Sequence, residues 1–144
     1  MQQLRADKNG SCRTPSGLVR VLVISQHDAV RRYLVAYLHR STGLTVSGDE
    51  LSADAIEHAH PDVLVLDLSR IGPGALRQAL DTAHDIGARV IALASLRGPD
   101  EERAVIEAGG LYRLKSAGAD GLADLILDTA TPETVGCGPS ALPG

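Results

Sequence analysis

Aromatic side chains are almost absent from this sequence, whose 144 residues include three Tyr and neither Phe nor Trp. Stacking of nucleic-acid bases on aromatic rings is therefore largely excluded. A net charge of −4 also argues against the basic surface that binding phosphates requires. We expect no direct nucleic-acid binding by this chain, and we expect a core built from Leu, Val, Ile and Ala.

Long apolar runs are also missing, since none reaches the roughly 18 residues that a membrane span needs. The stretch Met1–Lys8 has no apolar region behind its charges, so it does not have the pattern of a signal peptide. We expect a cytoplasmic protein without membrane association. Cysteine is scarce: Cys12 and Cys137 lie near opposite ends with no CxxC spacing, which predicts free thiols that pair only after oxidation.

Glycine, proline and small polar residues gather at the two ends of the chain. Residues 1–18 have the composition of a flexible leader, and residues 131–144 have that of a Pro/Gly-rich linker or tail. The folded domain is therefore expected to span residues 19–130.

Apolar runs alternate with helical patterns throughout the predicted domain. Asp28 and Ser52 are the expected N-caps of the first two helices. The expected strands span residues 19–25, 44–48, 63–67, 89–94 and 111–114, and the later helices span 74–86, 99–108 and 119–129.

Three of these strands are apolar throughout, which indicates a parallel sheet covered on both faces. Neither GxGxxG nor a Walker A motif is present. The prediction is an α/β fold, a flavodoxin-like (βα)5 three-layer sandwich with strand order 2-1-3-4-5. Its ligand site belongs at the carboxyl ends of the first and third strands.

Polar residues follow the carboxyl ends of the predicted strands. Asp67 ends the run Val63-Leu64-Val65-Leu66-Asp67, and Lys115 directly follows the fifth strand. With these residues at its strand ends, the segment 19–130 resembles the CheY-like receiver domain of two-component response regulators. The chain looks most like receivers that precede a helix-turn-helix output domain. Tyr112 also matches the family pattern, whereas Ser25, Gln26 and Ala94 stand at family positions with a different residue, and Ser95 is adjacent to Ala94.

The resemblance implies a role for each position. Asp67 takes the place of the phospho-acceptor. Lys115 takes the place of the lysine that pairs with the phosphoryl group, and Tyr112 takes the place of an aromatic switch residue. The hydroxyl that normally bonds the phosphoryl group is replaced by Ala94. Ser95 is adjacent, but neighbouring strand residues point to opposite faces, so it substitutes only if the strand end twists.

The acid pair that receivers carry after the first strand is replaced by Ser25 and Gln26. Magnesium prefers oxygen ligands and usually carboxylates, so with Asp67 alone we expect weak or absent magnesium binding and no cofactor. Lys115 is then expected to neutralise Asp67 directly; the simpler alternative is a carboxylate that caps the next turn. No nucleophile–base pair or phosphate loop is visible, so we predict no enzymatic activity.

The leading hypothesis is an atypical, or pseudo-, receiver domain of a bacterial transcriptional response regulator. It would act by protein–protein contact, as a homodimer with an attached or separate DNA-binding output domain, and without magnesium-dependent phosphorylation. One alternative keeps slow phosphorylation of Asp67, with a sensor kinase as partner. Another is a small-molecule sensor whose ligand enters an apolar pocket around Ser25, Gln26, Asp67 and Ala94 and shifts dimerisation.

Overall fold

A computed structural model describes residues 18–130 of the chain. The predicted leader, apart from Leu18, and the predicted tail lie outside the described residues, as do Cys12 and Cys137. Within residues 18–130, no helix combines the length and the apolar character needed to cross a membrane.

Strands and helices alternate along the described part of the chain. The strands are β1 (Val19–Ile24), β2 (Leu44–Asp49), β3 (Val63–Asp67), β4 (Arg89–Ala94) and β5 (Leu111–Leu114). The helices are α1 (Asp28–His39), α2 (Ala53–Ala59), α3 (Pro73–Asp85), α4 (Pro99–Glu107) and α5 (Leu122–Ala130), with a 3-10 turn η2 at Lys115–Ala117.

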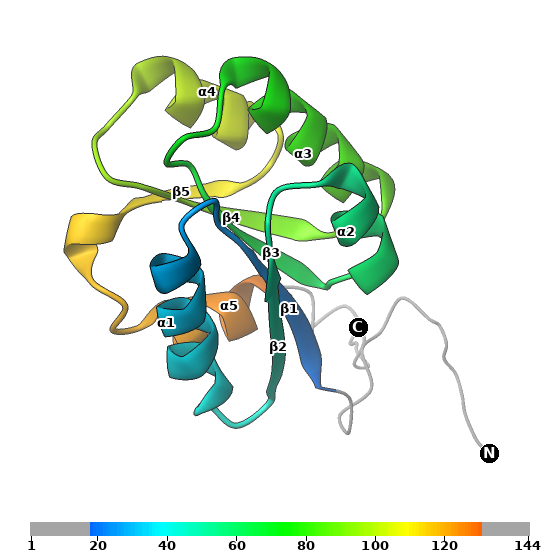
Figure 1. The fold of residues 1–144 in the computed structure, drawn as a ribbon, viewed down its shortest axis with the longest axis vertical. Coiled ribbons are helices and arrows are strands. Elements are labelled where there is room, and N and C mark those ends of the chain that lie inside the picture. Colours follow the sequence, from blue (N-terminus) through cyan, green and yellow to red (C-terminus); the bar gives the residue numbers. More distant parts are fainter. Residues whose placement is uncertain (1–17, 131–144) are drawn as a thin grey trace, which may run out of the picture.

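The five strands form one parallel sheet in the order β2-β1-β3-β4-β5, which confirms the predicted flavodoxin-like order. Helices α1 and α5 cover one face, and α2, α3 and α4 cover the other (Figure 1). In a parallel sheet all carboxyl ends meet at one edge. That edge brings together Ile24, Asp67, Ala94 and Leu114, which end β1, β3, β4 and β5.

Strand residues alternate between two apolar layers, as the period of a β-strand requires. In β3, Val63 and Val65 pack in the layer under α1 and α5, whereas Leu64 and Leu66 pack in the layer under α2, α3 and α4. All four are fully buried. No Phe or Trp contributes to either layer, in agreement with the predicted aliphatic core.

Of the two predicted helix N-caps, one is confirmed and the other is wrong. Ser52 is the N-cap of α2, since its hydroxyl accepts a hydrogen bond from the backbone N–H of Ala55 at 3.2 Å. The assignment of Asp28 was wrong: the N-cap position of α1 is His27, and Asp28 is the first helical residue. The Asp28 carboxylate instead pairs with Arg31 at 2.6 Å and Arg32 at 3.0 Å, because positions three and four residues on share its helix face.

Helix α5 begins later than predicted, at Leu122 instead of residue 119. The preceding segment is a loop in which Gly118 and Gly121 have φ values of +82° and +81°. This left-handed conformation suits glycine and interrupts a helix. The loop after β5 is therefore longer than the sequence pattern indicated, and Lys115 begins it.

Candidate functional site

Asp67 is the centre of the site at the carboxyl edge of the sheet. Its side chain is fully buried. Its Oδ1 atom lies 2.6 Å from Lys115 Nζ and accepts a hydrogen bond from the Ser69 backbone N–H at 3.1 Å. Its Oδ2 atom accepts a hydrogen bond from the Ser25 hydroxyl at 2.7 Å. The predicted direct pairing of Asp67 with Lys115 is therefore confirmed, and both carboxylate oxygens have partners.

This environment favours the ionised form of Asp67. Burial alone raises the pKa of the carboxyl, because the charged form loses its water. Hydrogen bonds from Lys115, Ser25 and the Ser69 N–H, together with the positive charge of Lys115, outweigh burial and bring the pKa below its ordinary value. The site is a buried carboxylate that stays charged because an internal cation and two further donors hold it.

Ser69 and Ser95 extend the site outward from Asp67. Lys115 Nζ donates to the Ser69 hydroxyl at 2.9 Å, and that hydroxyl lies 3.4 Å from the Ser95 hydroxyl. Ser95 reaches the site edge because β4 ends at Ala94 and the chain bends at Ser95, so the strand alternation no longer applies. Sequence reasoning missed Ser69; its place two residues after Asp67, in the following turn, was the signal.

Ser25 and Gln26 turn to different partners. Ser25 is fully buried, and its hydroxyl donates to Asp67 while accepting from the His27 backbone N–H at 3.1 Å. The Gln26 Oε1 atom accepts from the backbone N–H of Leu51 at 2.8 Å, so this side chain holds the loop after β2. Neither residue supplies negative charge.

These residues do not fit a magnesium ion. Magnesium demands near-octahedral oxygen coordination and is usually held by carboxylates and waters. The one carboxylate among the matched positions, Asp67, is already paired with Lys115, and the nearby Asp28 is paired with two arginines. Nowhere in residues 18–130 do three His, Cys, Asp or Glu side chains gather as a metal would require.

Arg31 was not singled out from the sequence as a site residue, yet it supports the site from α1. Its guanidinium donates to the backbone carbonyl of Ser25 at 2.7 Å. Its stem lies against Gly48 of β2, where an added Cβ would come within 2.9 Å of Arg31 Cγ. Arg31 therefore fixes the loop that presents Ser25 to Asp67.

Ala94 and Tyr112 occupy the β4–β5 side of the edge. Ala94 is 2% exposed, lies in the apolar layer under α2, α3 and α4, and offers no hydroxyl to the site. The Tyr112 hydroxyl accepts from the Gly98 N–H at 3.0 Å and lies 3.4 Å from the Leu96 carbonyl, to which it donates. Tyr112 thus links β5 to the loop before α4; its role as a switch stays a prediction.

The apolar pocket was expected around Ser25, Gln26, Asp67 and Ala94. Three of these four residues are at most 2% exposed, so they are closed to a ligand in this conformation. An apolar pocket of about 290 Å³ instead lies beside them, lined by residues of α1, α5 and the loop after β5, including Lys115.

Comparisons with known proteins give a consistent result, although no family model matches the chain. The chain is 32% identical over 116 residues to the transcriptional regulatory protein LiaR of Bacillus subtilis, which covers 76% of the chain and 54% of LiaR. It is 28% identical over 123 residues to the response regulator VraR of Staphylococcus saprophyticus, covering 81% of the chain and 59% of VraR. The chain thus spans little more than half the length of these relatives.

A solved structure extends the likeness to the fold. The signal receiver domain of the response regulator NarL from Mycobacterium tuberculosis superposes with a TM-score of 0.68 at 23% identity, over 79% of this chain and 97% of that domain. The strand order 2-1-3-4-5 and the pairing of Asp67 with Lys115 at the carboxyl edge of the sheet are the features expected of a receiver domain. The relatives found by sequence point to the same family. The chain belongs to the receiver-domain family of response regulators.

Proposed function

We propose that the chain is the receiver domain of a transcriptional response regulator that signals by protein–protein contact without the usual magnesium-dependent phosphorylation. It would work in the cytoplasm as a homodimer, with an attached or separate DNA-binding output domain, and would carry no catalytic activity of its own. The likeness to LiaR, a transcriptional regulatory protein, supports the regulatory role.

The observation that carries this proposal is the buried pair of Asp67 and Lys115. In a metal-dependent receiver a magnesium ion would neutralise the acceptor carboxylate during attack on phosphorus. Here the lysine ammonium, 2.6 Å away, already does so, and the other carboxylate oxygen accepts from Ser25. An attack by Asp67 would require opening a fully buried side chain.

Exposed apolar side chains support signalling through protein contact. Leu96 is 83% exposed, Ile106 is 55% exposed and Leu111 is 41% exposed. They lie on the loop after β4, on α4 and on the edge strand β5, which are consecutive segments of the fold. Exposed large apolar side chains on neighbouring segments favour a partner surface. The hydroxyl of Tyr112 connects this loop to β5 through Gly98.

Thermal unfolding in the presence of magnesium tests the proposal. A ligand stabilises a protein only to the extent that it binds the folded form. Because the donor set does not fit magnesium, we expect the Tm of the wild-type chain to be the same in magnesium chloride and in sodium chloride of equal ionic strength. A saturable rise in Tm with magnesium that disappears in Asp67→Asn would contradict the proposal.

Slow phosphorylation remains the second candidate function. Lys115 and the Ser69 hydroxyl lie at the Asp67 carboxylate and would offer positive charge and a hydrogen bond to a phosphoryl group. Intact-mass spectrometry after incubation with acetyl phosphate, with and without magnesium, separates it from the first.

A further inference from the structure

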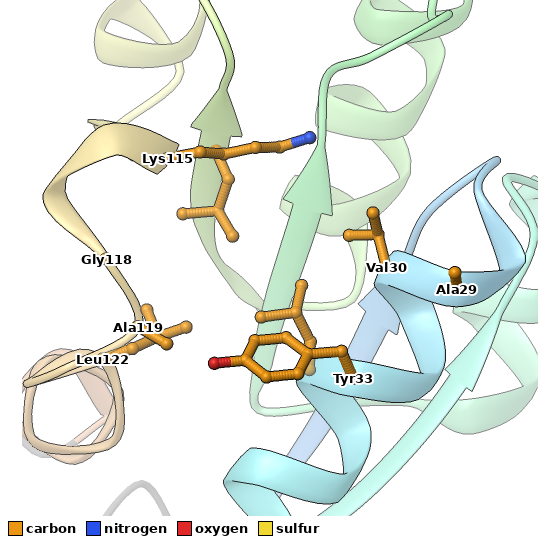
Figure 2. A pocket seen from close by; sticks show the side chains of 9 residues that line it. Ala29, Val30, Tyr33, Lys115, Gly118, Ala119 and Leu122 are labelled. Carbon is orange, nitrogen blue, oxygen red and sulfur yellow. The ribbon is translucent and has the colours of Figure 1, made fainter.

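An apolar pocket of about 290 Å³ opens between α1, the loop after β5 and α5. Figure 2 shows the side chain of Tyr33 reaching across from α1 toward Leu122, with the stem of Lys115 crossing on the opposite side. The lining residues are Ala29, Val30, Tyr33, Leu34, Leu93, Lys115, Gly118, Ala119 and Leu122.

The pocket results from small side chains and from the late start of α5. Residues 119–121 form a loop where the sequence pattern predicted the first helical turn. The residues of this loop that face the pocket are Gly118 and Ala119, and Ala29 faces it from α1. A core without Phe or Trp offers no large side chain to fill the space.

The lining restricts the chemistry of an occupant. Only two of the nine lining side chains carry a polar atom, the hydroxyl of Tyr33 and the ammonium of Lys115. An ammonium has three N–H donors, and within residues 18–130 Lys115 directs them to two partners, Asp67 and Ser69. The third donor has no protein partner within residues 18–130, so it is open to an acid that reaches past the Lys115 stem.

We propose that this pocket binds a small, predominantly apolar molecule with a single acidic group. The apolar body would lie between α1 and α5, against Tyr33 and Leu122, and the acid would accept a hydrogen bond from Lys115. The volume is at the lower end of the range for ligand pockets, which suits a molecule of one or two rings.

Lys115 connects the pocket to the site at Asp67. Its stem lines the pocket, while its ammonium holds the buried carboxylate. A ligand that fixes Lys115 would stabilise the pair with Asp67 and so supply an input that needs no phosphoryl group. This inference deepens the proposed function, and it rests on that function only for the claim that the ligand replaces a phosphoryl input. Binding itself is measured without reference to magnesium or phosphorylation.

Titration of the full 144-residue chain with 2-naphthoate, followed by amide NMR, tests the proposal. We expect saturable shifts centred on Val30, Leu93, Ala119 and Leu122. Ala119→Leu fills the pocket and should weaken binding at least about tenfold. Ala117→Leu is the matched control, since Ala117 is exposed and does not line the pocket, and it should bind like the wild type.

Two further comparisons keep the test decisive. If Ala119→Leu fails to fold, Ala29→Leu fills the other wall from an exposed position on α1 and should weaken binding in the same way. The neutral 2-naphthalenemethanol should bind more weakly than 2-naphthoate. Absence of saturable shifts, or wild-type affinity in the pocket-filling variants, would overturn the proposal. Equal binding of the two probes would overturn the assignment of the acid to Lys115.

A magnesium-induced rise in Tm would defeat the proposed function and leave these binding results intact. A failed titration would leave the proposed function standing without this ligand. The two failures are therefore distinguishable.

Discussion

The pair of Asp67 and Lys115 is energetically asymmetric. Asp67 is fully buried, whereas 27% of the Lys115 side chain is exposed. Loss of the lysine would strand a charge in the interior, and loss of the aspartate would leave a lysine that is able to turn toward water. The carboxylate therefore depends on the lysine more than the lysine depends on the carboxylate.

Replacing Lys115 with Met should lower the free energy of unfolding by about 3 kcal/mol, the lower end of the effect of breaking a buried pair. The low end applies because Asp67 keeps its hydrogen bonds from Ser25 and Ser69. Urea-induced unfolding measures the change. Asp67→Asn should cost less than Lys115→Met, and the double variant should be more stable than Lys115→Met alone. A double variant less stable than either single variant would show that the unpaired Asp67 charge does not cause the destabilisation of Lys115→Met.

The lowered pKa of Asp67 gives stability a defined dependence on pH. The folded state binds the Asp67 proton less tightly than the unfolded state, whose carboxyl has a pKa near 3.9. The stabilisation is thus fully present at neutral pH and is lost as the pH falls below about 4 toward the folded-state pKa. Unfolding free energies measured from neutral pH into this acid range should fall more steeply for the wild type than for Asp67→Asn. Equal dependence of the unfolding free energy on pH in the two proteins would contradict the lowered pKa of Asp67.

Some of these residue contacts were predictable and others were not. The pairing of Asp67 with Lys115 follows from two opposite charges at strand ends that meet on one edge. The hydrogen bond from Gln26 to the Leu51 N–H and that from Arg31 to the Ser25 carbonyl depend on rotamers and loop paths, which a linear sequence does not specify.

At the scale of elements, apolar periodicity predicts the strands and most helices closely, because each element buries one face in the aliphatic core. Errors fall at helix starts. Asp28 has the residue type of a cap, but its pairing with two arginines places it inside α1. Gly118 and Gly121 delay α5, and the sequence alone does not show which glycine adopts a left-handed conformation.

Two glycine substitutions test the packing of the elements. A Cβ on Gly110, before β5, would lie 3.0 Å from the Val90 carbonyl and 3.0 Å from Val105 Cγ1, so Gly110→Ala should destabilise the fold by about 1–3 kcal/mol. The control is Gly74→Ala in α3, where an added Cβ would meet no atom within 4 Å apart from its chain neighbours and its own helix backbone. It should stabilise the fold by about 0.4–1 kcal/mol. Thermal unfolding of both variants measures the difference, and a tolerated Gly110→Ala would show that β5 packs less closely against β4 and α4.

For the whole molecule, the strand order was predictable because a parallel sheet without a dinucleotide or Walker motif leaves few arrangements. The pocket was misplaced, since a void depends on how α1 and α5 pack across the loop at Gly118 and Ala119. The sequence indicated an apolar space near the site and could not show which residues enclose it.

Intact-mass spectrometry after incubation with acetyl phosphate, with and without magnesium, tests the central claim most directly. The wild type and Asp67→Ala are measured side by side. We predict no phosphorylated species in any sample, because the Asp67 carboxylate is fully buried and paired with Lys115 and Ser25, and the donor set does not fit magnesium. A mass increase of one phosphoryl group that requires both magnesium and Asp67 would contradict it and make this chain a metal-dependent receiver. An increase that requires Asp67 but not magnesium would establish slow phosphorylation instead.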